Sequence, residues 1–242
     1  MLLRGTPQDR RDWLDRAISQ IYPAYDERLS KYEKIRIQKN NLLKSDYIDE
    51  ALLDVYNEQL VITGANIIFL RKKFLKEIEK IAYEKHRLIS NSEEFSIGYT
   101  CSESDIEAIS EYLKKEFESR RNEEIARKQS CVGPHRDDVE FSINNINAIK
   151  FASQGQQRTL VLSLKLAELE LIKNKTGYSP ILLLDDVLAE LDEVRQNYLL
   201  KTIETGIQTI ITSVDTLLFD EDFLKDVQIY SIENGAVKTN PQ

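Results

Sequence analysis

The chain of 242 residues has no long hydrophobic run and only two cysteines. No stretch of about 18 apolar residues occurs, which excludes a hydrophobic helix long enough to cross a bilayer. Cys101 and Cys131 form neither a Cys-x-x-Cys motif nor a cluster with histidine, so neither a disulfide framework nor a zinc site is expected. The expected compartment is therefore the reducing cytoplasm.

A second absence concerns phosphate binding. The sequence contains no Gly-x-x-x-x-Gly-Lys-Ser/Thr motif, the glycine-rich loop whose backbone amides cradle nucleotide phosphates. These residues alone are therefore expected to be inactive toward nucleotides.

The net charge of −8 argues against nucleic-acid binding, but the charges are unevenly distributed. Residues 1–44 carry ten Lys and Arg against six Asp and Glu, and residues 71–87 carry seven against three. Residues 185–226 carry three basic residues against eleven acidic ones. Separate basic and acidic regions suit phosphate contact and metal binding. Long solvated helices also carry many Lys and Arg side chains, so charge alone leaves both interpretations open.

Helical periodicity dominates the first part of the chain. Thr6 followed by Pro7 is typical of a helix start. A second helix is expected at about residues 24–44, and a third apolar pattern runs from about residue 47 to residue 89 (47–89). A pattern of that length predicts an antiparallel coiled-coil arm, so residues 1–92 are expected to form a helical arm domain.

Residues 93–242 mix strand and helix patterns. Alternation at residues 95–99 predicts a half-buried strand, and Ser102 is a candidate cap for the helix that follows. Residues 139–148 predict a β-hairpin with an Asn-Asn turn and with Ala148 on the return strand. Further along, a buried strand is expected at residues 208–213 and an edge strand at residues 227–232.

The most informative stretch is residues 151–192. A Ser-Gln-Gly-Gln sequence at residues 153–156 opens a leucine-rich helix, whose N-terminus suits an anion. Residues 180–184 predict a buried strand that carries Asp185 and Asp186 at its carboxyl end, where α/β sheets place ligands. Alone, the Ser-Gln-Gly-Gln sequence is usually only a helix cap, and an aliphatic run that ends in acids is usually only a core strand that meets a surface turn. Their order and spacing together indicate half of an ATP-driven clamp.

These motifs resemble the ABC-type ATPase heads of the RecF and SMC group, and the RecF family in particular. The similar residues lie at 5–7, 10–11, 14–15, 133–138, 153–159 and 181–192, so the resemblance spans nearly the whole chain. It implies an α/β fold, namely an incomplete ABC-type (P-loop NTPase) head with an antiparallel helical coiled-coil arm. Residues 93–242 would be the C-terminal part of the head, with its signature, Walker B strand and D-loop. The family carries its phosphate-binding loop in an N-terminal segment, so the chain looks like the C-terminal two-thirds of such a protein.

The resemblance also implies roles for the two acids. Asp185 would hold Mg²⁺, usually through water. Asp186 would be catalytic and would orient the attacking water, at a position where most ABC heads carry glutamate. Its shorter side chain implies slow turnover. The alternative for Asp186 is an ordinary helix cap or turn residue.

The other implied site residues act across a dimer seam. The family's signature, which contacts ATP held by the other subunit, corresponds to Ser153, Gln154, Gly155 and Gln156. Ser153 would offer its hydroxyl, and Gly155 would permit close backbone approach. Glu190 and Asp192 resemble the D-loop. A surface helix position explains Gln156 equally well, and an ordinary helix start explains Asp192 almost as well.

The histidines fit the resemblance less well. ABC heads usually carry a switch histidine after the next strand, but residues 211–214 offer hydroxyls and no histidine, which leaves the switch residue unassigned. A lone histidine in a turn, such as His135 beside Arg136, is more often structural than catalytic. His86 lies in a charged helix pattern and is expected to be solvated.

The function implied by the resemblance is that of a cytoplasmic DNA replication and repair protein. When complete, it would be a weak ATPase that binds ATP and Mg²⁺, forms an ATP-dependent homodimer and clamps single-stranded or gapped DNA in recombinational repair and the SOS response. Its partners would be single-stranded and double-stranded DNA and recombination mediator proteins of the RecO/RecR type.

DNA contacts are expected on the basic helices, at Arg10, Arg11, Arg71, Lys72 and Lys73. Two other functions stay open. One is a different ABC-type DNA-repair ATPase, although SMC-type proteins carry far longer coiled coils. The other is a non-enzymatic module whose helical arm binds DNA or protein.

Overall fold

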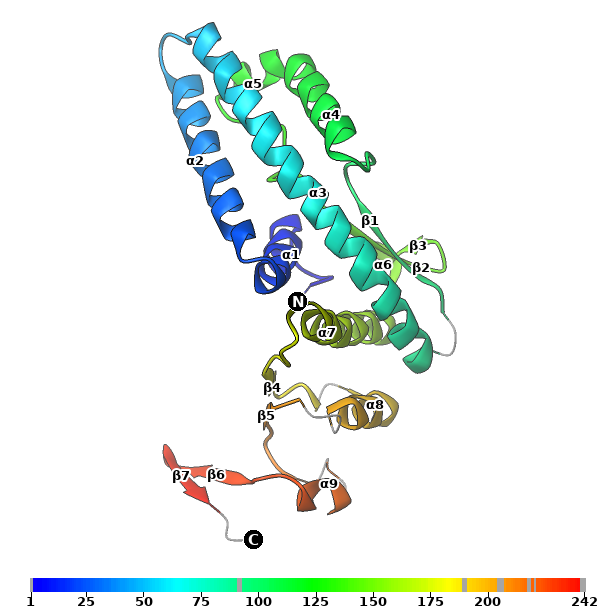
Figure 1. Ribbon diagram of the computed structural model, residues 1–242. Helices are drawn as coiled ribbons and strands as arrows, with labels where there is room; N and C mark the ends of the chain where they lie inside the picture. The colour runs from blue at the N-terminus through cyan, green and yellow to red at the C-terminus, as the bar shows by residue number, and fades with distance from the viewer. Residues whose placement is uncertain are drawn as a thin grey trace. The chain divides into compact units, whose positions relative to one another are not determined.

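The protein was studied as a computed structural model, which describes residues 2–90, 93–188, 191–203, 207–216, 219 and 221–239. The chain divides into two compact units, Met1–Pro180 and Ile181–Gln242. Figure 1 shows the helices and strands of each unit. Among the described residues, no helix is long and apolar enough to cross a membrane.

A long helix, α3 (Glu50–Ile89), is the spine of the first unit. Its 40 residues span about 60 Å at 1.5 Å per residue. After a short turn, α2 (Ala24–Lys44) lies antiparallel to α3, so the two predicted helices are confirmed and pack against each other (Figure 1). Three further helices pack against α3, namely α1 (Pro7–Ile21), α4 (Ile106–Ser119) and α7 (Gln154–Thr176). The domain boundary expected near residue 92 stays a prediction. The helices α4 and α7, which follow residue 92 in the sequence, pack against α3.

Side-chain caps set the starts of these helices. The Thr6 hydroxyl accepts from the Asp9 amide at 3.4 Å, and the Asp9 carboxylate accepts from the Thr6 amide at 2.6 Å, a capping box that confirms the start of α1. Asp49 caps α3, so this helix begins slightly later than its apolar pattern predicted. The prediction that Ser102 caps α4 is wrong. Asp105 accepts an amide of the first turn at 2.8 Å, and the helix begins only after that residue.

The first unit also contains a small antiparallel sheet of β1 (Phe95–Tyr99), β2 (Val139–Ile143) and β3 (Ile146–Asn147). Asn144 and Asn145 have φ of 50° and 62°, the left-handed conformation that a tight hairpin turn needs and asparagine tolerates. The predicted hairpin is therefore confirmed. Ala148 lies outside its return strand, because the Asn147 side chain caps the short helix α6 (Ala148–Phe151). A second short helix, α5 (Arg121–Arg127), follows α4.

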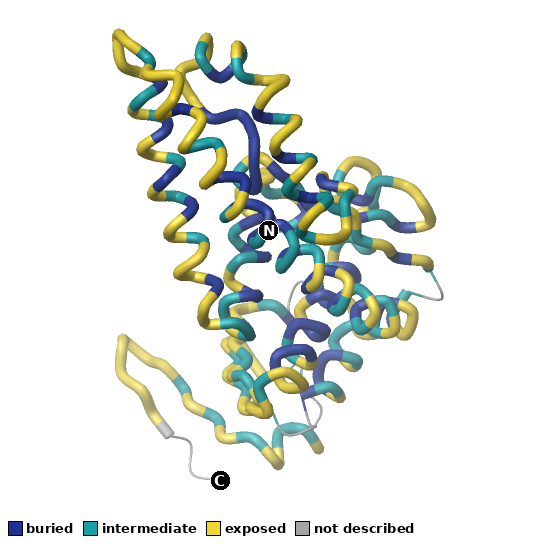
Figure 2. The backbone as a smooth tube through the Cα atoms, turned by 45° about the horizontal axis from the view of Figure 1, so that its top comes forward, coloured by how far each residue is buried: buried dark blue, intermediate teal, exposed yellow. Residues whose placement is uncertain are grey.

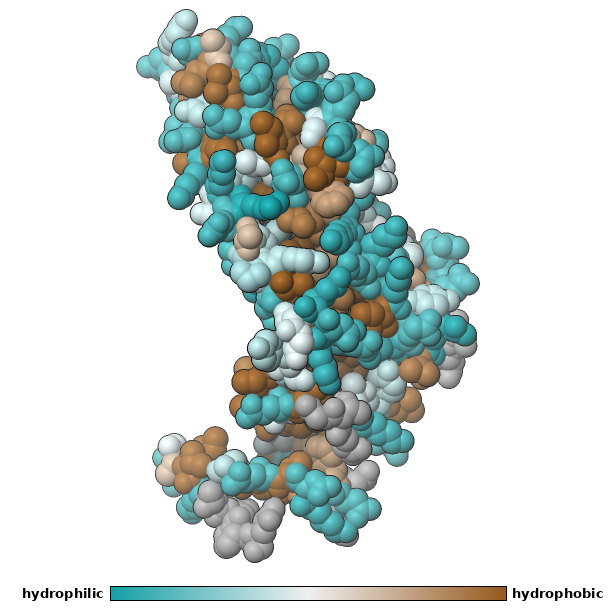
Figure 3. All heavy atoms as spheres, viewed as in Figure 1, coloured by the Kyte–Doolittle hydropathy of each residue, from teal (hydrophilic) through white to brown (hydrophobic). Residues whose placement is uncertain are grey.

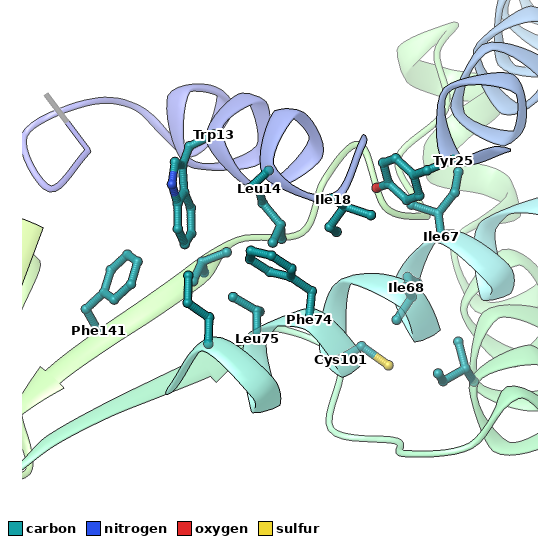
Figure 4. Close-up of a cluster of buried hydrophobic side chains, with 14 of the residues drawn as sticks. Trp13, Leu14, Ile18, Tyr25, Ile67, Ile68, Phe74, Leu75, Cys101 and Phe141 are labelled. Atoms are coloured by element: carbon teal, nitrogen blue, oxygen red, sulfur yellow. The ribbon is translucent and has the colours of Figure 1, made fainter. Parts of the chain in front are cut away.

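One hydrophobic core joins the helices to this sheet. Figure 2 shows buried positions recurring along the sides of the helices that face one another, and Figure 3 shows hydrophilic side chains over much of the visible face of the first unit. In the core, the Trp13 ring lies edge-on to Phe74 and tilted against Phe141, with ring centroids 6.3 and 6.2 Å apart (Figure 4). Its indole Nε1 donates to Glu168 of α7 at 3.1 Å. A single side chain therefore links α1, α3, α7 and β2.

A buried polar network surrounds Arg71 of α3, whose side chain is 2% exposed. Its guanidinium donates to both carboxylate oxygens of Asp15 at 2.8 Å. It also donates to the Tyr25 hydroxyl at 3.1 Å, the Tyr99 hydroxyl at 3.2 Å and the Pro134 carbonyl at 2.7 Å. Burial opposes the charge, but Tyr99, Tyr25 and Asp15 hold the pKa of Arg71 well above its ordinary value. We call these five residues the Arg71 network.

The turn at residues 133–136 packs against α2 beside this network. Gly133 has φ of 116°, and a Cβ atom there would lie 2.3 Å from the Tyr32 hydroxyl. That hydroxyl donates to Nδ1 of His135 at 2.6 Å, while Nε2 donates to the Ser130 carbonyl at 3.2 Å. Burial lowers the pKa of His135 to about 3, so the imidazole is neutral near pH 7. The side chain is held as a structural residue, as its place in a turn predicted.

The prediction that His86 is solvated is wrong. Its side chain is fully buried near the C-terminal end of α3. The Nε2 atom lies 3.4 Å from a carboxylate oxygen of Glu93, and the ring packs against Phe95 with centroids 5.6 Å apart. The charged residues around it in sequence occupy other faces of the helix, whereas its own face meets β1.

In the second unit, β4 (Leu182–Asp185) pairs in parallel with β5 (Thr209–Thr212). Both strands were predicted, but as fully buried. Leu184 is 8% exposed, whereas Leu183 is 69% and Ile210 is 54% exposed. Successive side chains of a strand point to opposite faces of its sheet, so one face of this pair is covered and the other is exposed. Among the described residues, this sheet has two strands.

The rest of the second unit consists of α8 (Glu193–Ile203), α9 (Glu221–Lys225), β6 (Tyr230–Glu233) and β7 (Ala236–Thr239). The predicted edge strand corresponds to β6, which forms an antiparallel hairpin with β7.

Replacing Arg71 with alanine should lower the free energy of unfolding by about 3–5 kcal/mol, because Asp15 would lose the partner of its charge. Lys73→Ala is the matched control on the same helix, since Lys73 is exposed, and it should change stability by less than about 0.5 kcal/mol. Urea unfolding followed by circular dichroism measures both variants. Similar small losses in the two would show that the Arg71 network does not hold the fold.

His135 should also make stability depend on pH. Its pKa is about 3 when folded and 6.5 when unfolded, so below about pH 6.5 the unfolded chain binds the proton first and stability falls as pH falls toward 3. Burial raises the pKa of Asp137, which acts in the opposite direction, but this contribution is common to the wild type and a His135 variant. In His135→Gln, thermal stability should fall less steeply between about pH 7 and pH 4. Parallel curves for the two proteins would contradict the neutral, partly buried imidazole.

Candidate nucleotide site

The candidate position in the first unit is the N-terminus of α7. The Ser153 hydroxyl accepts from the Gln156 amide at 3.2 Å, and the Gln156 side chain accepts from the Ser153 amide at 2.9 Å. Ser153 and Gln154 are exposed, and the Ser153 hydroxyl still carries its own O–H donor. The 23-residue helix behind them directs its positive end toward this position. The arrangement can bind an anion such as a phosphate.

Two contacts hold the start of α7. The Gln156 side chain donates to Glu93 at 2.8 Å, and the other carboxylate oxygen of Glu93 lies 3.4 Å from His86. One residue on, Gln157 accepts from the Arg4 guanidinium at 3.0 Å. The Gln156 side chain therefore holds the first turn of α7, and its contact with a nucleotide stays a prediction.

A second, separate candidate position lies in the second unit, where β4 and β5 end side by side. The Thr212 hydroxyl donates to Asp185 Oδ1 at 2.6 Å and accepts from the Asp186 amide at 3.1 Å. The same amide lies 3.3 Å from the Thr212 carbonyl oxygen. Asp186 has φ of 52°, which is uncommon for a residue other than glycine. One threonine thus contacts both acidic residues.

Asp185 is suited to a magnesium ion. Its carboxylate is an exposed, hard oxygen ligand, and Mg²⁺ is usually bound by one or two carboxylates together with phosphate oxygens and water. Within the part of the chain that the structure describes, no three metal-ligating side chains converge. A magnesium ion here would therefore depend on oxygens from a nucleotide and from water.

The D-loop residues are only partly described. Glu190 lies outside the described residues. The Asp192 carboxylate accepts from the Arg195 amide at 3.0 Å and pairs with the Arg195 guanidinium, so it caps α8. Gln196 donates to the carbonyls of Leu188 and Leu191 at 2.8 and 3.0 Å. The geometry is that of a helix start, and a D-loop role stays a prediction.

Three of the five expected DNA contacts are buried. Arg10 is 4% exposed and forms a bidentate pair with Asp138, both distances being 2.7 Å. Arg11 is 8% exposed and donates to the Asp137 carbonyl at 2.6 Å. Arg71 is enclosed in its network. The expectation that these guanidiniums face a DNA backbone is therefore wrong, because neighbouring carboxylates and carbonyls already satisfy them.

The two lysines that follow Arg71 differ from each other. The Lys72 ammonium donates to the Cys101 carbonyl at 2.5 Å and is partly buried. Lys73 is exposed, and its ammonium lies 5.8 Å from the centre of the Tyr22 ring. Of the five residues expected to contact DNA, Lys73 alone is exposed.

Sequence reasoning did not identify two residues of the candidate site. Thr212 was considered only among the hydroxyls of a possible switch segment, although the parallel pairing of two strands would have placed it beside Asp185. Glu93 was not singled out, and no local pattern marks it, because its partner Gln156 is 63 residues away.

Comparison with known proteins identifies the family. No family model matches the chain. The DNA replication and repair protein RecF of Bacillus cereus (strain G9842) is 44% identical over 246 residues, and that of Thermosynechococcus vestitus is 43% identical over 248 residues. Each alignment covers 98% of this chain, but only 66% and 64% of the two relatives. The chain thus spans just under two thirds of their length.

Solved structures agree with the sequences. The structure of the recombination mediator protein RecF with ATP matches 99% of this chain and 65% of its own, with a TM-score of 0.88 and 33% identity. An Smc head domain with an extended coiled coil from Pyrococcus furiosus matches with a TM-score of 0.51 at 12% identity, which supports the ABC-type head fold alone. On its sequence and its fold, the chain belongs to the RecF family of DNA replication and repair proteins.

Proposed function

We propose that this chain supplies two parts of an ATP site, the signature and the metal carboxylate, in an ATP-dependent DNA clamp of the RecF type. The observation that carries the proposal is the acidic pair at the carboxyl end of β4, where Thr212 of the neighbouring strand β5 contacts both Asp185 and Asp186. The capped and exposed N-terminus of α7 supports it. A relative in this family has been solved with ATP.

Each residue has a defined task in this proposal. Asp185 holds Mg²⁺, which neutralises phosphate charge when it is bound. Asp186 orients the attacking water, and its short side chain makes turnover slow. Ser153 donates its hydroxyl to the γ-phosphate of ATP on the other subunit, where Gly155 permits close approach. The ATP-binding site of each subunit is therefore completed by residues of the other subunit, and ATP drives homodimerisation.

The phosphate-binding loop is not among these residues, so hydrolysis requires a segment that supplies it. With that segment, the protein would be a weak cytoplasmic ATPase. It would clamp single-stranded or gapped DNA during recombinational repair and the SOS response, together with mediator proteins of the RecO/RecR type. The relative solved with ATP is itself described as a recombination mediator in the RecFOR pathway.

DNA would contact exposed lysines on α3. Lys73, Lys76 and Lys80 are all exposed, and their spacing places them on one face of the helix. They replace the buried arginines as the expected phosphate contacts. A lysine row of this kind binds backbone phosphate without reading sequence.

The two parts of the ATP site should fail differently when they are mutated. In a protein that joins this chain to a phosphate-binding-loop segment, Asp185→Asn should weaken Mg²⁺-dependent ATP binding by about 10- to 100-fold, the scale seen at metal sites. Ser153→Arg should leave ATP binding to one subunit nearly unchanged and block ATP-driven dimerisation, because the arginine would occupy the seam. Nucleotide titration and light scattering measure the two effects. Equal loss of ATP binding in both variants would contradict the trans role of Ser153.

Replacing Lys73, Lys76 and Lys80 with glutamate should weaken DNA binding and flatten its salt dependence. Each backbone phosphate that no longer has a lysine partner should change the slope of log affinity against log salt by about 0.9 on duplex DNA. The control is the charge reversal of Lys114 and Lys115, two exposed lysines on α4. Fluorescence anisotropy at several salt concentrations measures both proteins. An unchanged slope in the α3 variant would place the DNA contact elsewhere.

A further inference from the structure

We propose that Thr212 is a positioning residue that fixes the Asp185 carboxylate and the Asp186 backbone of the nucleotide site, an inference that rests on the proposed function. Its hydroxyl is used twice. It donates to the Asp185 carboxylate at 2.6 Å and accepts from the Asp186 amide at 3.1 Å. A hydrogen bond to an ionised acceptor is stronger than a neutral one, and linked hydrogen bonds polarise each other. The two contacts therefore support each other.

The backbone of Asp186 explains why such a support is needed. With φ of 52°, this residue is in the left-handed region, which aspartate tolerates better than most residues with a Cβ atom but which is still uncommon, and hydrogen bonds from neighbouring groups stabilise it. The holding groups are the Thr212 hydroxyl and the Thr212 carbonyl oxygen, at 3.1 and 3.3 Å from the Asp186 amide. Thr212 thus fixes the direction in which the chain leaves β4, and with it the backbone position from which the Asp186 side chain extends.

The hydroxyl of Thr212 is not needed for the core. The residue is exposed at the carboxyl end of β5, so its side chain contributes little to packing. Valine has the same shape and an equal preference for strands, and it lacks only the hydroxyl. Thr209 offers a matched comparison on the same strand, because its hydroxyl donates to the Ile207 carbonyl at 3.1 Å at the opposite end of β5.

A threonine at this point positions groups without changing its own charge near neutral pH. Its effect should therefore appear in how well Asp185 and Asp186 work, as a higher Mg²⁺ requirement and a lower kcat. It should not appear as a new pH dependence. A residue with a purely structural role would change stability and leave both kinetic quantities in place.

The first experiment uses this chain alone and requires no ATP hydrolysis. The exchange of the Asp186 amide with solvent is followed by mass spectrometry or NMR in Thr212→Val, Thr212→Ser and Thr209→Val. The valine variant at position 212 should exchange about tenfold faster, since the amide loses one of its acceptors. The serine variant and the Thr209 control should match the wild type. Exchange in Thr212→Val at the wild-type rate would overturn the proposal.

The second experiment uses the chain joined to a phosphate-binding-loop segment. Thr212→Val should lower kcat by about 10- to 100-fold and raise the Mg²⁺ concentration needed, and Thr212→Ser should restore both. Wild-type kinetics in Thr212→Val would overturn the positioning role. If the wild-type protein itself hydrolyses no ATP, the proposed function fails, while amide exchange still decides the role of Thr212. If the valine variant fails to fold, Thr212→Ala carries the same two measurements.

Discussion

The buried guanidinium of Arg71 is the interaction on which the first unit depends. Burying an arginine is unfavourable unless its charge and its donors are satisfied, and here one carboxylate, two hydroxyls and one carbonyl satisfy them. The partners come from α1, α2, β1 and the turn at residues 133–136. The network therefore sets where four separate segments meet α3, a task that apolar packing, being non-directional, does not perform with the same precision.

The turn and α1 extend this arrangement toward the surface. Tyr99 of the network donates to the Asp137 carboxylate at 2.8 Å, and Arg11 donates to the backbone carbonyl of the same residue. At its other end, α3 reaches His86, which lies beside Glu93, and Glu93 holds the first turn of α7 through Gln156. Polar contacts and the long helix α3 thus connect the helical hairpin to the N-terminus of α7.

Much of this fold could be predicted from local patterns. Thr6 before Pro7, the long apolar repeat of α3 and the Asn144-Asn145 turn each specify their element within a few residues, and the helices and the hairpin followed. The family could also be inferred, because its motifs are short and contiguous. What the patterns left out depends on distant partners: Arg71 meets Asp15 across 56 residues, and Arg11 meets Asp137 across 126.

Some of these misses had a signal. Arg71 lies on the same helical face as Ile67, Phe74 and Ile78, all of them buried, so periodicity alone should have marked it as an inward residue that requires a carboxylate. His86 extends that face by eight residues beyond Ile78. Thr212 gave no such signal, because a threonine at the end of a strand is common, and only the register of β4 against β5 places it beside Asp185. The charge counts gave wrong DNA contacts, because a count does not distinguish a solvated lysine from a buried arginine.

In the proposed function, each ATP site is shared between two subunits. The signature of one subunit faces the phosphates that the other subunit holds. The most direct measurement is the ATPase rate of the joined protein as a function of its concentration, below the concentration at which it dimerises. A site shared by two subunits predicts a rate that rises with the square of the concentration. A rate that stays proportional to concentration throughout would mean that one subunit hydrolyses ATP alone, and it would contradict the claim.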